Sequence, residues 1–168
     1  MPALSSLRAR MSWRDALGRL VSGEQYTVTH EAIPELQKAH AGLCERAALM
    51  RVHAEAAPNQ LSQQELSRLA DEDDSEAKRL AEALAALGAE VPRTEPVPPV
   101  GSLNHWERLV QDLEAHRSAM RRLREEAVHF AETVPQTAAL FDRLCRLEEA
   151  HALRLRDLIA RTDALALN

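Results

Sequence analysis

Aromatic and glycine residues are scarce in this chain, where aromatic side chains make up 3% of 168 residues and only five glycines occur. Runs of β-branched residues, which β-strands favour, are also missing. Ala, Leu, Arg and Glu, which are strong helix formers, dominate the composition instead. The composition therefore predicts an all-α protein, and the length suits one domain with a core of its own.

The chain also lacks a positive net charge, since the formal value is −5 with histidines neutral. Nucleic-acid binding needs a basic surface that displaces counterions, so we expect no nucleic-acid partner. No apolar run approaches the roughly 20 residues that a transmembrane segment requires. The N-terminus has no continuous apolar stretch of the kind that marks a secretory signal. We therefore expect neither a membrane span nor secretion.

Cysteine is limited to Cys44 and Cys145, which lie far apart and belong to no CxxC pair. Isolated cysteines of this kind are typical of reduced structural thiols. Cysteine usage thus favours a cytoplasmic location.

Hydrophobic periodicity divides the chain into an N-terminal segment, residues 1–31, and a four-helix bundle, residues 32–165. The N-terminal segment combines an amphipathic helix over residues 4–21 with a connection. This helix is basic on one face, so it can dock on the bundle, bind a protein partner or a second copy of the chain, or lie on an anionic membrane.

Proline and capping signals place the helices of the bundle. The first is predicted to start near Pro34, and the second to open with a capping box at Ser62 and Glu65. The prolines of residues 88–102 make that segment extended, and at about 3.1 Å per residue it spans roughly 40–45 Å. The second helix is roughly 40 Å long at about 1.5 Å per residue. This match predicts a long crossover between helices two and three.

Each of the four apolar stripes is interrupted in its middle by side chains that do not belong in a core. They are His40 in the first helix, Asp73 and Glu76 in the second, His116 in the third, and Glu148 and His151 in the fourth. Residues three apart share a helix face, and folding the two hairpins about their turns brings the six to one level. Three carboxylates and three imidazoles suit one or two divalent ions of iron, manganese or zinc.

Three short motifs support a family resemblance. Residues 147–151 read LEEAH, residues 73–80 read DDSEAKRL and are followed by Leu87-Gly88, and residues 38–42 read KAHAG. These motifs resemble the fourth, second and first helices of the ferritin-like superfamily, in particular its rubrerythrin and bacterioferritin branch. The resemblance covers about residues 34–162. It implies a di-iron four-helix bundle engaged in iron handling or in oxygen or peroxide chemistry.

The ligand set departs from the family pattern, which has one Glu on each of the first and third helices and Glu-x-x-His on the second and fourth. The family's first Glu falls at or near Leu43, so His40 would substitute from one turn away. Glu114 lies near the family's third-helix Glu but points away from the stripe that contains His116. The resemblance therefore implies a variant dinuclear site, in which Glu76 or Glu148 bridges the two ions.

Metal-free interpretations of the same residues stay open at this point. His40 and His116 can be ordinary core histidines, Asp73 belongs to an acidic run, and Glu76 can pair with an arginine. The histidines at 53, 105 and 129 are expected at the rim of the bundle. The arginine-rich helices can also neutralise buried carboxylates as a salt-bridge network. The alternative function is accordingly a metal-free ferritin-like bundle that acts as an interaction or scaffold protein. A hemerythrin-like oxygen carrier fits less well, because the second helix has no histidine.

Overall fold

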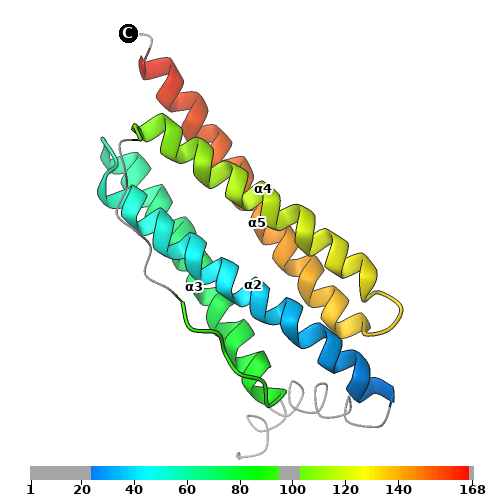
Figure 1. Ribbon diagram of the computed structural model, residues 1–168. Helices are drawn as coiled ribbons and strands as arrows, with labels where there is room; N and C mark the ends of the chain where they lie inside the picture. The colour runs from blue at the N-terminus through cyan, green and yellow to red at the C-terminus, as the bar shows by residue number, and fades with distance from the viewer. Residues whose placement is uncertain (1–23, 95–102, 167–168) are drawn as a thin grey trace, which may run out of the picture.

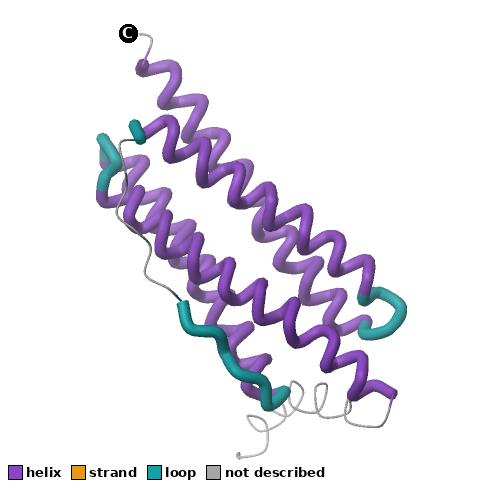
Figure 2. Tube along the Cα trace, viewed as in Figure 1, coloured by secondary structure: helices purple, strands orange, loops and turns teal. Residues whose placement is uncertain are grey.

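The computed structural model describes residues 24–94 and 103–166, which form four long α-helices (Figure 1). Their bounds are Glu24–Glu55 for α2, Gln60–Ala86 for α3, His105–His129 for α4 and Pro135–Ala166 for α5. Within the described ranges there is no strand, as Figure 2 shows, which confirms the predicted all-α class. The amphipathic helix expected over residues 4–21 lies outside the described residues.

Helix α2 begins earlier than the sequence predicts. The expected connection before Pro34 is wrong, because Glu24–Glu55 is one continuous helix with Pro34 inside it. A proline in a helix interior removes one backbone hydrogen bond and usually ends or bends the helix. That general rule favoured a start at Pro34. The division of the chain between residues 31 and 32 stays a prediction, and α2 runs across it.

Side-chain caps and one glycine fix other helix ends. The side chain of Asn59 accepts a hydrogen bond from the backbone N–H of Ser62 at 2.9 Å, so α3 starts three residues before the predicted capping box. At the start of α4, Asn104 and Glu107 form a reciprocal capping box. Gly88 follows α3 with φ +70°, a left-handed conformation that glycine adopts without strain.

The helices form two antiparallel hairpins, α2 with α3 and α4 with α5 (Figure 1). Arg108 near the start of α4 donates a hydrogen bond to the carbonyl oxygen of Ala56, just past the end of α2 (2.9 Å). At the other end of the bundle, Gln37 donates to the carbonyl oxygen of Glu90 at 2.7 Å, so the chain after α3 turns back along α2. Helices α3 and α4 therefore start at the same end, which confirms the long crossover.

The hydrophobic core is split into two clusters at opposite ends of the bundle. One gathers around Phe130 and Phe141, and the other around Met50 and Leu155. Between them lies a layer of buried polar side chains, which comprises Arg46, Asp73, His116, Glu148 and His151, while His40 is buried among residues of the first cluster. Buried polar groups destabilise a fold unless they are hydrogen-bonded, paired or bound to an ion. The polar layer is therefore the candidate site. No helix in the described ranges is both long and apolar enough to cross a membrane.

Candidate metal centre

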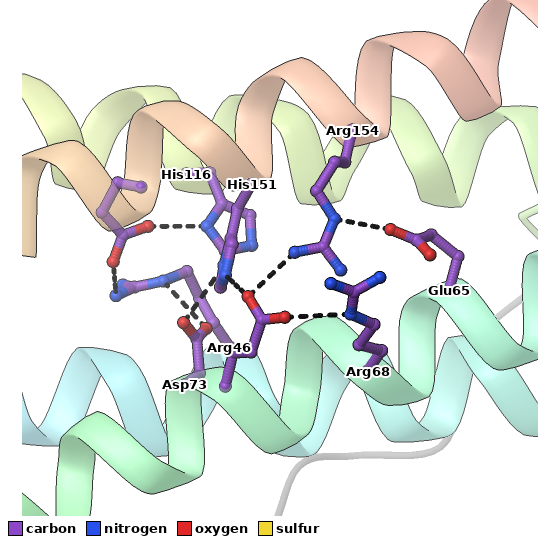
Figure 3. Close-up of polar contacts among 9 residues, drawn as sticks. Arg46, Glu65, Arg68, Asp73, His116, His151 and Arg154 are labelled. Atoms are coloured by element: carbon purple, nitrogen blue, oxygen red, sulfur yellow. Dashed lines mark hydrogen bonds and ion pairs between the residues drawn. The ribbon is translucent and has the colours of Figure 1, made fainter.

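All four described helices contribute to the centre of the polar layer (Figure 3). Its members are Arg46 from α2, Asp73 from α3, His116 from α4, and Glu148 and His151 from α5. Asp73, His116, Glu148 and His151 are all 0% exposed. Glu148 and His151 are three residues apart on one helix, and this spacing turns both side chains towards the same interior level.

The carboxylate of Glu148 binds one side chain through each of its two oxygens. Its Oε2 atom accepts a hydrogen bond from Nδ1 of His116 at 2.6 Å, and its Oε1 atom pairs with Nη2 of Arg46. Burial would raise the pKa of the Glu148 carboxyl, but the Arg46 charge and the His116 hydrogen bond outweigh burial and lower the pKa. Glu148 is therefore a carboxylate in the middle of the core.

His151 connects the centre to the face between α3 and α5. Its Nε2 atom lies 3.0 Å from Oε2 of Glu72, and its Nδ1 atom lies 3.2 Å from Oδ1 of Asp73. Burial alone would lower the pKa of His151, but the carboxylates of Asp73 and Glu72 outweigh it and raise the pKa. Glu72 also accepts a hydrogen bond from Arg154 at 2.8 Å, which extends the network to the surface.

Four atoms at the centre of this layer are buried and have no hydrogen-bond partner. They are both carboxylate oxygens of Asp73, Nε2 of His116 and Nδ1 of His151, whose contact with Asp73 is not aligned as a hydrogen bond. The three residues each offer a ligand atom, and these atoms lie within 4.8 Å of one another. An unsatisfied buried polar group costs about 1–3 kcal/mol. A cation bound between the three residues would take one ligand atom from each of them.

The donor set fits a transition-metal ion. Two imidazoles with one carboxylate suit iron, manganese or zinc. In metal centres the second ring nitrogen of a histidine ligand is usually held by a carboxylate or a carbonyl. Both histidines meet this condition, because Glu148 binds Nδ1 of His116 and Glu72 binds Nε2 of His151.

The structure brings together four of the six predicted residues, namely Asp73, His116, Glu148 and His151. His40 is buried, but its Nε2 atom lies 3.7 Å from Sγ of Cys44 on its own helix. Glu76 forms ion pairs with Arg79 at 2.5 Å and Arg143 at 2.8 Å. Neither His40 nor Glu76 is among the converging donor atoms.

Sequence reasoning missed Arg46 and Glu72. A signal for Arg46 was present, because it lies three residues after Leu43 and four before Met50, both of which are buried on the same face of α2. Glu72 gave no such signal, since it neighbours Asp73 in an acidic run and remains partly exposed.

A second buried polar pair ties α2 to α4. Nδ1 of His53 lies 2.8 Å from Oδ2 of Asp112, and the two side chains are each 1% exposed. The expectation that His53 lies at the rim is therefore wrong. The histidines at 105 and 129 were also expected at the rim, and they are half-buried and exposed, respectively.

Comparison with known proteins supports the architecture. The structure of Dps from Thermosynechococcus elongatus superposes with a TM-score of 0.64, over 79% of this chain and 92% of that chain. The chain has the ferritin-like fold. Sequence identity to this Dps is 19%, so the ferritin-like fold is shared while any shared activity is a separate question. No family model matches the sequence, and no curated protein matches it. The variant ligand set stays a prediction.

Proposed function

We propose that this ferritin-like bundle is a metalloprotein that holds one divalent transition-metal ion between Asp73, His116 and His151. The observation that carries this proposal is that Asp73, His116 and His151, from three helices, are buried and each offer a ligand atom within 4.8 Å of the others. Iron is the first candidate, and manganese and zinc also suit a set of oxygen and nitrogen donors.

A single ion is proposed in place of the two that the family resemblance implies, because Arg46 provides a cation of its own. Its guanidinium pairs with Glu148, and its Nε atom lies 3.8 Å from Oδ2 of Asp73. Arginine stays charged at all physiological pH values. A second dication beside it would be repelled within the low dielectric of the core.

Each residue of the centre then has a defined role. The hydrogen bond to Glu148 keeps the proton of His116 on Nδ1, so the lone pair of Nε2 is available. Glu72 likewise binds Nε2 of His151, so Nδ1 is the ring atom that would face the ion after loss of its proton. An ion held by three protein ligands keeps open coordination positions, and its chemistry would be the iron handling or oxygen and peroxide chemistry that the resemblance implies. The apolar clusters on both sides restrict water.

The test is a metal titration of the full chain after removal of metals with a chelator. Anaerobic Fe(II), or Co(II) followed by its visible absorption, should bind at one ion per chain. His116→Gln and His151→Gln should each abolish tight binding. The matched control is His40→Gln, which alters a buried histidine outside the converging group. Absence of tight binding to the wild-type chain, or an equal loss in the control, would contradict the proposal.

A metal-free bundle is the second candidate, and the arginines of the polar layer favour it. Arg46 neutralises Glu148, and Arg154 neutralises Glu72, so these carboxylates are compensated without an ion. In that case His151→Gln changes stability while metal content stays at zero. The protein would then act through an interaction surface, for which residues 1–21 are the predicted segment. Their deletion should alter oligomeric state or partner binding and leave the bundle folded.

A further inference from the structure

A surface groove lies between α2 and α4, beside the buried centre. Its cavity measures about 440 Å³, and its polar lining consists of Lys38, Glu45, Arg46, Ser118 and Arg122. Three of these side chains are cationic and one is anionic. Lys38 pairs with Glu35 and Arg46 pairs with Glu148, so Arg122 is the cation of the groove without an ion pair among the described residues.

Two guanidinium groups converge on the floor of this groove, above the backbone of Gly42. A Cβ atom at position 42 would lie 3.0 Å from Nη1 of Arg46 and 3.4 Å from Nη2 of Arg122. Glycine in a helix interior is less stable than alanine. Its presence here is explained by the room that the two guanidinium groups need.

These guanidinium groups keep free hydrogen-bonding capacity. Arg46 pairs with Glu148 through Nη2 of its guanidinium. The other terminal nitrogen, Nη1, lies nearest to Gly42 on the groove side. Within the part of the chain that the structure describes, Arg122 forms no ion pair, and neither does Glu45. Arg122 therefore has a charge and hydrogen-bond donors that no carboxylate of the described residues uses.

We propose that the groove between α2 and α4 binds a small oxyanion, such as a phosphate or a carboxylate, between Nη1 of Arg46 and the guanidinium of Arg122. Guanidinium groups bind these anions through paired, charge-assisted hydrogen bonds. Ser118 and Lys38 line the same cavity and add further donors. The carboxylate of Glu45 also lines the groove and repels an anion, so we expect a modest affinity.

Calorimetric titration of the chelator-treated full chain with inorganic phosphate, at constant ionic strength, tests this site. Binding should be saturable at one phosphate per chain, with a dissociation constant on the order of 1 mM, as expected for a few charge-assisted hydrogen bonds in an open groove. A parallel titration with acetate distinguishes the two anion classes. A phosphate site should bind acetate more weakly, and a carboxylate site should bind acetate at least as tightly.

Substitutions of two neighbouring arginines on α4 distinguish a specific anion-binding site from nonspecific electrostatic attraction. Arg122→Gln should weaken anion binding by about tenfold. Arg121→Gln removes the same charge from the neighbouring position, which does not line the groove, and it should change the affinity by less than about twofold because a charge without direct contact is screened. Gly42→Ala should also weaken binding, since the added Cβ would lie 3.0 Å from Nη1 of Arg46 and displace that end of the guanidinium.

Two results would overturn the proposal. One is a wild-type chain that binds neither phosphate nor acetate saturably, and the other is an equal loss of affinity in Arg121→Gln and Arg122→Gln. Anion binding is measured on the metal-free chain. Its failure therefore leaves the metal proposal intact, and failure of metal binding leaves the anion site intact.

Discussion

Arg46 of α2 and Glu148 of α5 form an ion pair across the middle of the bundle, between side chains that are 10% and 0% exposed. Within this pair the guanidinium of Arg46 compensates the buried carboxylate of Glu148. Removal of one partner from a buried ion pair leaves the other charge uncompensated, which costs about 3–5 kcal/mol.

Arg46→Met should therefore lower the free energy of unfolding of the metal-free chain by about 3 kcal/mol, as measured by urea denaturation at pH 7. The matched control is Arg117→Met, which breaks the exposed pair with Glu114, whose side chains are 41% and 57% exposed. That change should cost less than about 1 kcal/mol. Equal losses in the two variants would show that the Arg46 pair has no special role.

The same arginine should limit the number of bound ions. Arg46→Gln removes the internal cation and frees Oε1 of Glu148, so Co(II) titration should rise from one ion per chain to two. Circular dichroism checks that the variant remains helical. A folded variant that still binds a single ion would contradict the role of Arg46 as a substitute for a second cation.

Glu72 should support metal binding without touching the ion, because it holds Nε2 of His151. Glu72→Gln should weaken metal affinity by about 10- to 100-fold, the usual effect of losing a carboxylate that orients a histidine ligand. Glu65→Gln is the control, since Glu65 pairs with the same Arg154 but does not contact His151. Competition with a coloured chelator measures both affinities, and similar losses in the two variants would argue for a general charge effect.

The pair of His53 and Asp112 should contribute to stability alone. Asp112→Ala leaves a buried imidazole without its partner, so the free energy of unfolding should fall by about 1–3 kcal/mol. Metal stoichiometry and affinity should stay unchanged, because this pair lies among the residues of the Met50 and Leu155 cluster. A loss of metal in this variant at unchanged helicity would place the pair in the metal centre.

His40 should make stability depend on pH. Burial lowers the pKa of His40 below 6.5, so the unfolded chain binds its proton more readily than the folded chain does. Stability should then fall as pH drops below about 6.5, at up to about 1.4 kcal/mol per pH unit. His40→Gln should flatten this slope, whereas the exposed His129→Gln should leave it unchanged. Urea denaturation between pH 7.5 and pH 5.5 gives both slopes.

The architecture was predictable because it depends on features that repeat along the sequence. Apolar residues recur with helical spacing over four segments, and the length of the proline-rich connection determines which helices can be antiparallel. The start of α2 was misplaced because proline usually ends a helix, whereas Pro34 lies inside a continuous one. Local preference at that position is overridden by the packing of α2 against the bundle.

The centre was predictable only for residues that interrupt an apolar stripe. Asp73, His116, Glu148 and His151 were found in this way. The partners of the buried carboxylates were not predictable. The apolar spacing that reveals Glu148 does not indicate whether its carboxylate binds an ion or the guanidinium of Arg46. Glu76 lies on the predicted face, yet two nearby arginines compete for its carboxylate.

The polar layer has a further consequence for how the helices align along their length. A shift of α5 by one turn, about 5.4 Å, would move His151 away from Asp73 and place it against apolar side chains of the neighbouring cluster. Apolar contacts alone tolerate such sliding, because one leucine can replace another. Charged partners cannot be exchanged in this way, so the layer sets the longitudinal register of the bundle.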